Sequence, residues 1–269
     1  MTVSLRRGVA AAALALCFAI PAAAQDFAFR ATAGLLIDAE TGMTLAAKDA
    51  DRPIPPASMS KLMTLFIAFE AIRDGRLSFD DQITVGKNAF RKGGSTTFLK
   101  LGQRVSVADI IRGIVVQSGN DAAIALAEAM AGTELAFAEA MTQRAREIGM
   151  TNSRFVNATG WPDPNEFMSV RDIAIVARRL IEDFPDLYPL FAETEFEFNG
   201  VNQNNRNPLL YGYRGGDGLK TGHTEEAGYG LAGSAVRDGR RLISVVTGLP
   251  SRRARREESE RLLDWGFRN

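Results

Sequence analysis

The chain has 269 residues, of which 46% are hydrophobic, so it can bury a substantial core and is not a small disulfide-stapled scaffold. Its 32 lysine and arginine residues balance 32 aspartate and glutamate residues, so nucleic acid is not an expected partner. The single histidine and single cysteine would leave a zinc site to carboxylates, and no metal is expected.

The first 24 residues have the pattern of an export signal. Two arginines precede an apolar run over residues 9–20, and small residues at 22–24 suit a signal peptidase. We expect cleavage after Ala24 and a catalytic domain over residues 25–269. Cleavage would remove Cys17, where lipid attachment is the alternative, disfavoured by the bulky residue before it. No second apolar run is long enough to span a bilayer.

The segment after the signal predicts two strands and then a helix. Ala33–Asp38 and Met43–Lys48 have strand patterns, and three prolines then exclude regular structure as far as Ser58. Apolar residues at helical spacing follow, and Gly75 closes the segment. The helix would place Lys61 one turn after Ser58, on the same face.

The middle of the chain is predicted to be helical, forming a lobe over residues 80–195 approximately. Ser106 and Asp109 predict a capping box at the start of a helix that ends in the turn at 117–120. Three more helices are expected, at 121–130, 133–148 and 169–182.

Strand patterns return after Asn199, at 218–221, 228–237 and 240–249, and a helix follows at 252–265. Arg253 with Glu257, and Arg256 with Glu260, lie one helical turn apart, which favours a solvated face over a phosphate-binding patch. Strands from both ends of the chain predict one sheet: an α/β lobe interrupted by an all-α lobe, with a site between them.

Three strings indicate a nucleophilic serine: Ser58-Met59-Ser60-Lys61, Ser118-Gly119-Asn120, and Lys220-Thr221-Gly222 followed by His223. Each string alone is weak or moderate evidence for such an enzyme, and the order and wide separation of the three strings strengthen that evidence. A serine attacks once a neighbour removes its proton, and Lys61 can do so only if its amine is neutral. We predict that burial and the charge of Lys220 lower the pKa of Lys61.

These strings and their surroundings, Pro56–Leu62, Ser118–Ala122 and Asp217–Thr224, resemble the low-molecular-mass penicillin-binding proteins. Those are serine-type D-alanyl-D-alanine carboxypeptidases of peptidase family S11. The resemblance implies a β-lactamase/DD-peptidase-like fold, a mostly antiparallel sheet flanked by helices with an inserted helical lobe. It also implies a cofactor-free hydrolase in the periplasm or at the cell-wall face. The enzyme would release D-alanine from a peptidoglycan pentapeptide through an acyl-enzyme and be inhibited by β-lactams.

The resemblance also assigns roles at the site. Ser58 is the nucleophile, Lys61 the base, and Ser118 the proton relay to the leaving amine. The Asn120 amide would hold both Lys61 and the substrate peptide. The backbone amides of Ser58 and His223 would stabilise the tetrahedral oxyanion.

The free carboxylate of the substrate needs a clamp of cations and hydroxyls. The candidates are Lys220, Thr221 and Arg206, with Gly222 completing the third string. Arg206 suits the role best because its fork matches a carboxylate in two hydrogen bonds.

Other interpretations of the site stay open. A serine β-lactamase would need a base for water, and Glu166 lacks the asparagine four residues later that the class A pattern has, while Gly119 also departs from it. A DD-endopeptidase and a silent wall-binding module are further alternatives. A Ser-His-Asp triad built on His223 is disfavoured because no Gly-x-Ser-x-Gly elbow exists. The oligomeric state, the deacylation base and a missing C-terminal β-rich domain are not decided by the sequence.

Overall fold

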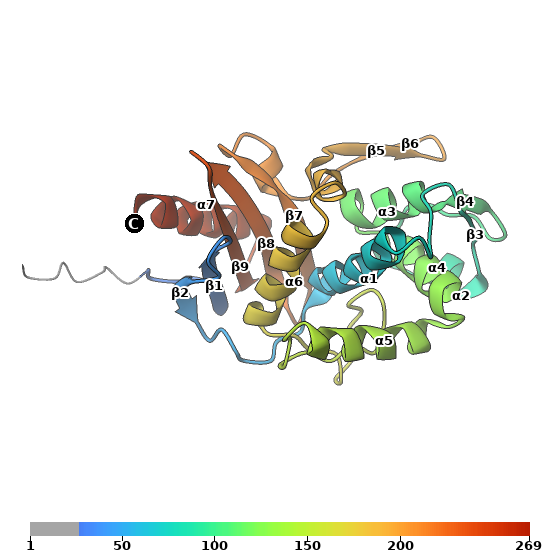
Figure 1. The fold of residues 1–269 in the computed structure, drawn as a ribbon, viewed down its shortest axis with the longest axis horizontal. Helices are drawn as coiled ribbons and strands as arrows, with labels where there is room; N and C mark the ends of the chain where they lie inside the picture. The colour runs from blue at the N-terminus through green and yellow to red at the C-terminus, as the bar shows by residue number, and fades with distance from the viewer. Residues whose placement is uncertain (1–26) are drawn as a thin grey trace, which may run out of the picture.

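A computed structural model describes residues 27–269 of the chain, so the expected signal and its cleavage site lie outside the described residues. Figure 1 shows a sheet on one side and a group of helices on the other. This architecture confirms the predicted α/β lobe with an all-α lobe. Of the helices between residues 27 and 269, none combines the length and apolar character that crossing a bilayer requires.

The main sheet has five antiparallel strands in the order β2-β1-β9-β8-β7. Their bounds are β1 Ala33–Asp38, β2 Thr44–Lys48, β7 Gly216–Thr224, β8 Gly228–Arg237 and β9 Arg240–Leu249. β1 pairs with β9, with Leu35 opposite Val245, so the two ends of the chain share one sheet as predicted. β7 lies at the edge and leaves one side free of any strand of this sheet.

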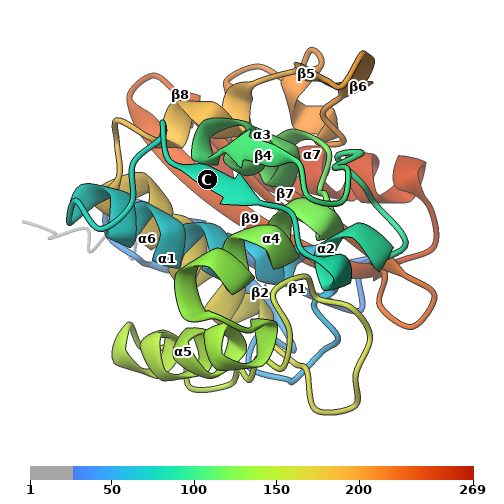
Figure 2. The same ribbon diagram turned by 90° about the vertical axis from the view of Figure 1, so that its right-hand side faces the viewer.

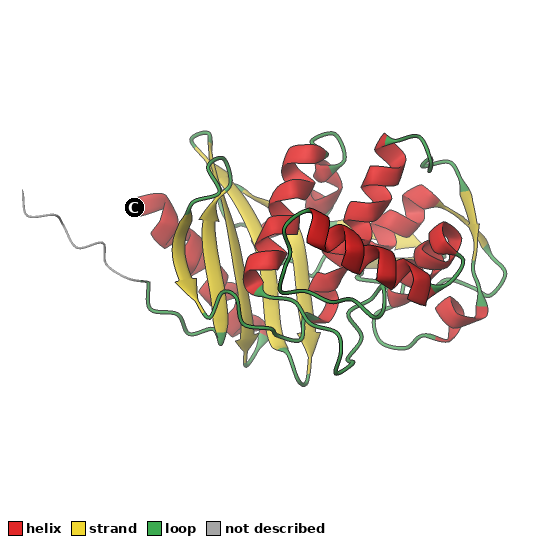
Figure 3. Cartoon of the chain, turned by 60° about the horizontal axis from the view of Figure 1, so that its bottom comes forward, coloured by secondary structure: helices red, strands yellow, loops and turns green. Residues whose placement is uncertain are grey.

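Helices cover both faces of this sheet, α7 (Arg252–Arg268) on one and α6 (Val170–Asp183) on the other (Figures 1 and 3). The alternation along β9 explains the two layers, since successive side chains of a strand point to opposite faces. Leu242 and Val246 are buried in the cluster that includes α7, whereas Ile243 and Val245 belong to the larger cluster on the other side.

The helical lobe is built around α1 (Lys61–Arg73), which follows the 3-10 turn η1 (Ala57–Ser60). Its side chains are buried on every side, as in a central helix of a core. α3 Val107–Val116, α4 Asn120–Ala131 and α5 Glu134–Glu147 pack on it, and α2 Lys87–Arg91 packs on α4. Figure 2 shows α3 and α5 on opposite sides of this group.

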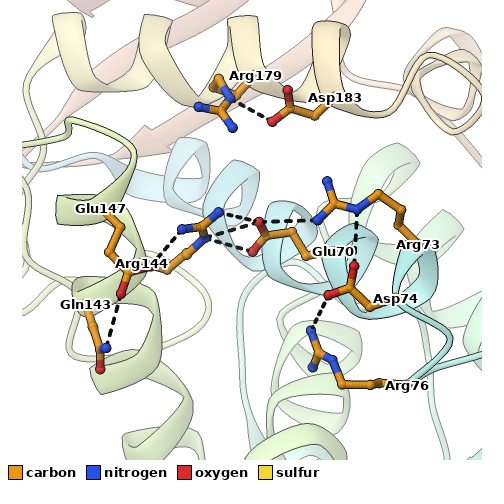
Figure 4. Close-up of polar contacts among 9 residues, drawn as sticks. All are labelled: Glu70, Arg73, Asp74, Arg76, Gln143, Arg144, Glu147, Arg179 and Asp183. Carbon is orange, nitrogen blue, oxygen red and sulfur yellow. Dashed lines mark hydrogen bonds and ion pairs between the residues drawn. The ribbon is translucent and has the colours of Figure 1, made fainter.

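An ion-pair network fixes α5 against the end of α1 (Figure 4). The Glu70 carboxylate accepts hydrogen bonds from Arg144 at 2.7–3.1 Å, and Arg144 also pairs with Glu147 at 2.7 Å. Glu70 raises the pKa of Arg144 above its ordinary value, which means that the guanidinium stays charged. The C-terminal end of α1 is therefore held by ion pairs that lie outside the apolar core.

Side chains cap the N-termini of several helices, and the predicted cap at Ser106 is one of them. The Ser106 hydroxyl accepts a hydrogen bond from the Asp109 amide at 3.1 Å, which confirms that capping box. Further caps stand before α5, α6 and α7, at Thr133, Ser169 and Ser251.

Two short hairpins were not predicted. β3 (Gln82–Thr84) pairs with β4 (Arg104–Ser106), and β5 (Glu195–Phe198) pairs with β6 (Val201–Asn204). The second turns at Asn199-Gly200, where both residues have positive φ, 50° and 76°. Asn-Gly between two short alternating runs is a strong hairpin signal that the sequence did contain. Two further 3-10 turns, η2 Tyr188–Ala192 and η3 Pro208–Leu210, connect these elements to β7.

Candidate active site

Ser58 stands in the turn η1, wedged between the sheet and the helical lobe. Its side chain is partly exposed, whereas the residues around it in η1 are buried. β7 approaches η1 so closely that a Cβ at Gly222 would lie 3.0 Å from the Pro56 carbonyl oxygen. On the lobe side, a Cβ at Gly160 would collide with the carbonyl oxygen of Ala57. Both glycines allow their backbones to fix the nucleophile from two directions.

Lys61 is fully buried beside this serine. Its Nζ lies 3.0 Å from Ser58 Oγ and donates to Asn120 Oδ1 at 2.8 Å and to the Thr159 carbonyl at 2.6 Å. Burial, followed by the positive charge of Arg206, lowers the pKa of Lys61 from 10.5 to about 7. The amine can therefore exist in its neutral form near neutral pH, as a base requires.

Two cations act near the amine of Lys61. The prediction named Lys220, and Arg206 is a second positive charge that lowers the pKa of Lys61. Lys220 is itself buried, 2% exposed, and burial and the charge of Lys61 hold its pKa well below the ordinary value. The two buried lysines therefore repel each other, and Arg206 adds to this repulsion.

The second string joins the site through the start of α4. Asn120 is oriented by its two hydrogen bonds, accepting from Lys61 and donating from Nδ2 to the Gly93 carbonyl at 2.9 Å. Ser118 has a positive φ of 59°, and its hydroxyl is buried without a partner among the described residues. Because it lines the pocket beside Ser58, that hydroxyl is available to a substrate or a proton.

Asp121 fixes the loop that borders the site. Its carboxylate accepts hydrogen bonds from the backbone amides of Thr97 and Leu99 and from the Thr96 hydroxyl, at 2.8–3.1 Å. The carboxylate is 2% exposed, so these charge-assisted bonds form away from water. The sequence reasoning did not assign Asp121 a role, although it directly follows the second string.

The cleft extends to both sides of Ser58. One hollow, of about 380 Å³, is lined by Ser118, Thr221, Gly222, Arg206 and other residues, and the second, of about 220 Å³, by Asn120, Thr159 and Trp161 among others. Three residues line both hollows: Ser58, Ser95 and His223. Ser58 therefore stands where the two hollows meet.

Two side chains at the larger hollow have defined positions. Arg206 Nη1 donates to Ser95 Oγ at 2.5 Å, and burial lowers the pKa of Arg206. The His223 ring stacks on Tyr229 with centroids 3.9 Å apart, so it is packed as an aromatic surface. That stacking gives no support to a Ser-His-Asp triad.

Glu166, considered above as a deacylation base for a β-lactamase, lies behind Lys61 and contacts the loop that leads to Thr159. Its Oε2 accepts hydrogen bonds from the Val156 and Asn157 amides at 2.7 and 3.2 Å, which fixes the loop leading to Thr159. The Thr159 carbonyl is one of the acceptors for Lys61. Burial raises the pKa of Glu166 to about 7. One oxygen of the carboxyl therefore supports the loop behind Lys61, whereas its Oε1 is buried without a partner among the described residues.

All nine residues predicted for the site meet in this cleft or directly behind it: Ser58, Lys61, Ser118, Asn120, Arg206, Lys220, Thr221, Gly222 and His223. A serine beside a buried lysine, at the edge of a cation-lined hollow, is the arrangement found in the class of serine enzymes that transfer acyl groups with a lysine base.

Comparisons with known proteins agree with this class. The family model described as D-alanyl-D-alanine carboxypeptidase, peptidase S11, matches residues 20–251. The chain is 41% identical to the D-alanyl-D-alanine carboxypeptidase DacC of Escherichia coli (strain K12), covering 98% of this chain and 70% of DacC. It is 41% identical to DacA of Haemophilus influenzae, covering 87% of this chain and 61% of that relative.

A solved structure with the same fold is penicillin binding protein 6B from Escherichia coli, with a TM-score of 0.88, 40% identity and coverage of 93% of this chain and 81% of that one. The chain belongs to the D-alanyl-D-alanine carboxypeptidase family, peptidase S11. The predicted family and fold class are confirmed, and the relatives' names support the predicted hydrolase activity.

Proposed function

We propose that this chain is a serine-type D-alanyl-D-alanine carboxypeptidase. It would release the terminal D-alanine of peptidoglycan stem peptides through an acyl-enzyme on Ser58 and be acylated by β-lactams at the same atom. The observation that carries the proposal is the 3.0 Å contact between Ser58 Oγ and the buried amine of Lys61, whose pKa lies at about 7.

Acylation starts when neutral Lys61 accepts the proton of Ser58 Oγ, which attacks the carbonyl carbon of the penultimate D-alanine. The oxyanion that forms faces the backbone amides of Ser58 and His223. The proton then passes from Lys61 through the Ser118 hydroxyl to the leaving amine. The peptide bond breaks, D-alanine departs, and an ester on Ser58 remains.

Deacylation reverses these proton transfers. Lys61 is neutral again after the leaving amine has taken its proton, so it can activate a water that attacks the ester carbonyl. Glu166 assists this step through the loop that it supports, since two backbone amides of that loop donate to its Oε2 and the loop carries the Thr159 carbonyl that accepts from Lys61. Hydrolysis returns the proton to Ser58 and releases the shortened stem peptide.

The two hollows divide the substrate between them. The leaving D-alanine and its carboxylate suit the hollow that contains Arg206 and Thr221. The acyl part suits the hollow that contains Asn120 and Trp161, and its backbone can pair with the free edge of β7.

Mass spectrometry after brief penicillin treatment tests the nucleophile. We expect a long-lived penicilloyl adduct on Ser58, together with release of D-alanine from a pentapeptide mimic. Fast, repeated turnover of a chromogenic cephalosporin would favour a β-lactamase instead. Absence of both the adduct and D-alanine release would contradict the proposal and favour a silent wall-binding module.

Arg206 can be tested as the carboxylate clamp. Arg206→Ala should raise KM for peptides that end in D-alanyl-D-alanine, because the fork that matches the carboxylate is lost. A thioester substrate whose leaving group lacks a carboxylate is the control, and its acylation should be affected much less. Equal losses on both substrates would remove Arg206 from the clamp.

The same proposal places the enzyme at the bacterial cell wall, exported and processed after Ala24, with residues 25–269 as the catalytic domain. The charged residues, apolar run and small residues at the start of the sequence support export, and the relatives named D-alanyl-D-alanine carboxypeptidases are bacterial. N-terminal sequencing of the protein recovered from the periplasm tests the predicted cleavage site after Ala24. A mature chain that retains residues before 25 would contradict it.

A further inference from the structure

The hollow beside Ser58 carries more positive charge than one terminal carboxylate needs. Besides Arg206 it is lined by Arg252 and Arg255, from the first turn of α7, and no aspartate or glutamate is among its lining residues. Its volume of about 380 Å³ falls in the range of sites for whole small molecules, roughly 300–1,000 Å³. A leaving alanine, with a methyl side chain, would use a small part of it.

Arg252 and Arg255 differ from their neighbours on the same helix. Three other arginines of α7 form ion pairs at 2.6–2.8 Å with glutamates of that helix: Arg253–Glu257, Arg256–Glu260 and Arg261–Glu258. Within residues 27–269, neither Arg252 nor Arg255 has such a pair. Arg268, at the other end of α7, also has no ion pair among the described residues, but of these three arginines only Arg252 and Arg255 line the hollow.

Arg255 is the more unusual of the two because it is only 7% exposed. Its Nη2 donates to the Arg206 carbonyl at 3.2 Å, its guanidinium lies 6.0 Å from the Tyr229 ring centroid, and its Nε has no partner among the described residues. A buried cation without a counter-charge is costly, and an incoming anion would offset that cost.

The arginines also repel one another. Burial and the charge of Arg252 lower the pKa of Arg255 to about 10, and the same two causes lower the pKa of Arg206. A bound anion would relieve this repulsion. The N-terminus of α7, at which Arg252 stands, adds partial positive charge on the same side.

We propose that Arg252 and Arg255 bind a second carboxylate, so that the enzyme accepts leaving amino acids whose side chain ends in a carboxylate. Such a leaving group is a dicarboxylic amino acid, for example a C-terminal D-glutamate. Its α-carboxylate takes the place of that of D-alanine at Arg206, and its second carboxylate reaches Arg252 and Arg255. The inference rests on the proposed function and adds a leaving-group preference to it.

Three peptides with the same acyl part test this preference, ending in D-Ala-D-Ala, D-Ala-D-Glu and D-Ala-D-Gln. Glutamate and glutamine have nearly the same shape and differ in charge, so the ratio of their kcat/KM values isolates the second carboxylate. Charge-assisted hydrogen bonds contribute enough for a preference of about tenfold for D-Glu over D-Gln. The ratio cancels any general loss of activity in a variant.

Arg252→Gln should bring the ratio close to one, and it is expected to fold because Arg252 is exposed. Arg253→Gln is the matched control, since Arg253 stands one residue away on α7, exposed and paired with Glu257. It should keep the wild-type ratio. High salt should lower the wild-type ratio as well, because the hollow is open to solvent ions.

A wild-type ratio of one or below would overturn the inference, and so would an Arg252→Gln ratio equal to that of the wild type. In both cases release of D-alanine from the D-Ala-D-Ala peptide would show that the carboxypeptidase proposal stands. Failure to cleave all three peptides, with no penicilloyl adduct on Ser58, would overturn both proposals together.

Discussion

The rate at which Ser58 is acylated should depend on pH through the amine of Lys61. Only neutral Lys61 can accept the serine proton, and burial together with Arg206 lowers its pKa from 10.5 to about 7. At pH 7 about half of the enzyme then has a neutral base, against roughly 0.03% for an unshifted lysine. The environment of Lys61 is therefore responsible for a factor on the order of a thousand in the fraction of enzyme with a neutral base at neutral pH.

A fluorescent penicillin measures this step alone, because its leaving group stays attached to the acyl-enzyme. The second-order rate constant for acylation should rise about tenfold per pH unit below pH 6 and level off above pH 8, with its midpoint at about 7. Stopped-flow traces between pH 5 and pH 9 cover the transition. Circular dichroism at each pH verifies that the protein stays folded.

Two variants separate this account from a general effect of pH. Lys61→Arg should lose acylation at every pH, because a guanidinium stays protonated. Arg206→Gln removes a cation that lowers the pKa of Lys61, so its midpoint should move to higher pH. A flat wild-type profile, a midpoint near 10.5, or a wild-type profile in Lys61→Arg would refute the reasoning.

Three predictions concern the support of the site, each measured by urea unfolding. Gly160→Ala should cost about 1–3 kcal/mol more than Gly75→Ala, since both have positive φ but only Gly160 meets a carbonyl oxygen; equal costs would contradict this. Asp121→Ala should lower the free energy of unfolding by about 3 kcal/mol or more, whereas Asp186→Ala, at an exposed position, should lower it by less than about 0.5 kcal/mol. An Asp121→Ala variant as stable as the wild type would contradict the supporting role of Asp121. The pKa of Glu166 is raised from 4.5 to about 7, so this carboxyl binds more protons in the folded state than in the unfolded state. The free energy of unfolding should therefore fall by roughly 3 kcal/mol as the pH rises from 4.5 to 7. Glu166→Gln should remove this fall, and an unchanged pH dependence of stability in the variant would contradict the argument.

Local patterns predicted most elements of the fold because their causes are local. The bounds of β1, β8 and β9 match the predicted ranges, since alternating apolar residues and the Asp238-Gly239 turn define them without reference to distant contacts. Helix caps were equally predictable, as at Ser106. β7 was predicted only over residues 218–221 but extends over Gly216–Thr224, because pairing with β8 orders residues beyond the apolar stretch.

The two short hairpins were not predicted because few of their side chains are buried. β5 and β6 alternate between exposed and partly buried residues, so their apolar signal is weak, and the Asn199-Gly200 turn was the remaining indication. β3 and β4 have three residues each, which is too short for a periodicity to be recognised. Neither hairpin contributes a residue to the three strings.

The site was predictable as a set of residues but not as an electrostatic system. The strings identified the serine and both lysines, yet the second cation acting on Lys61 depends on how Arg206 folds back toward the cleft, which no spacing encodes. The support that Glu166 gives to the Thr159 loop likewise requires a buried contact between segments. Chemistry follows from residue types, whereas pKa values follow from burial and neighbours.

Balanced net charge conceals this local imbalance. Over the whole chain 32 basic and 32 acidic residues cancel, but in the cleft two lysines and three arginines gather around Ser58, and the lining of its larger hollow contains no carboxylate. Such a concentration of like charge is unfavourable for folding, and burial of Lys61 and Lys220 adds to the cost. An anionic substrate offsets this cost when it enters the cleft, because the positive charges that repel one another then attract its carboxylate.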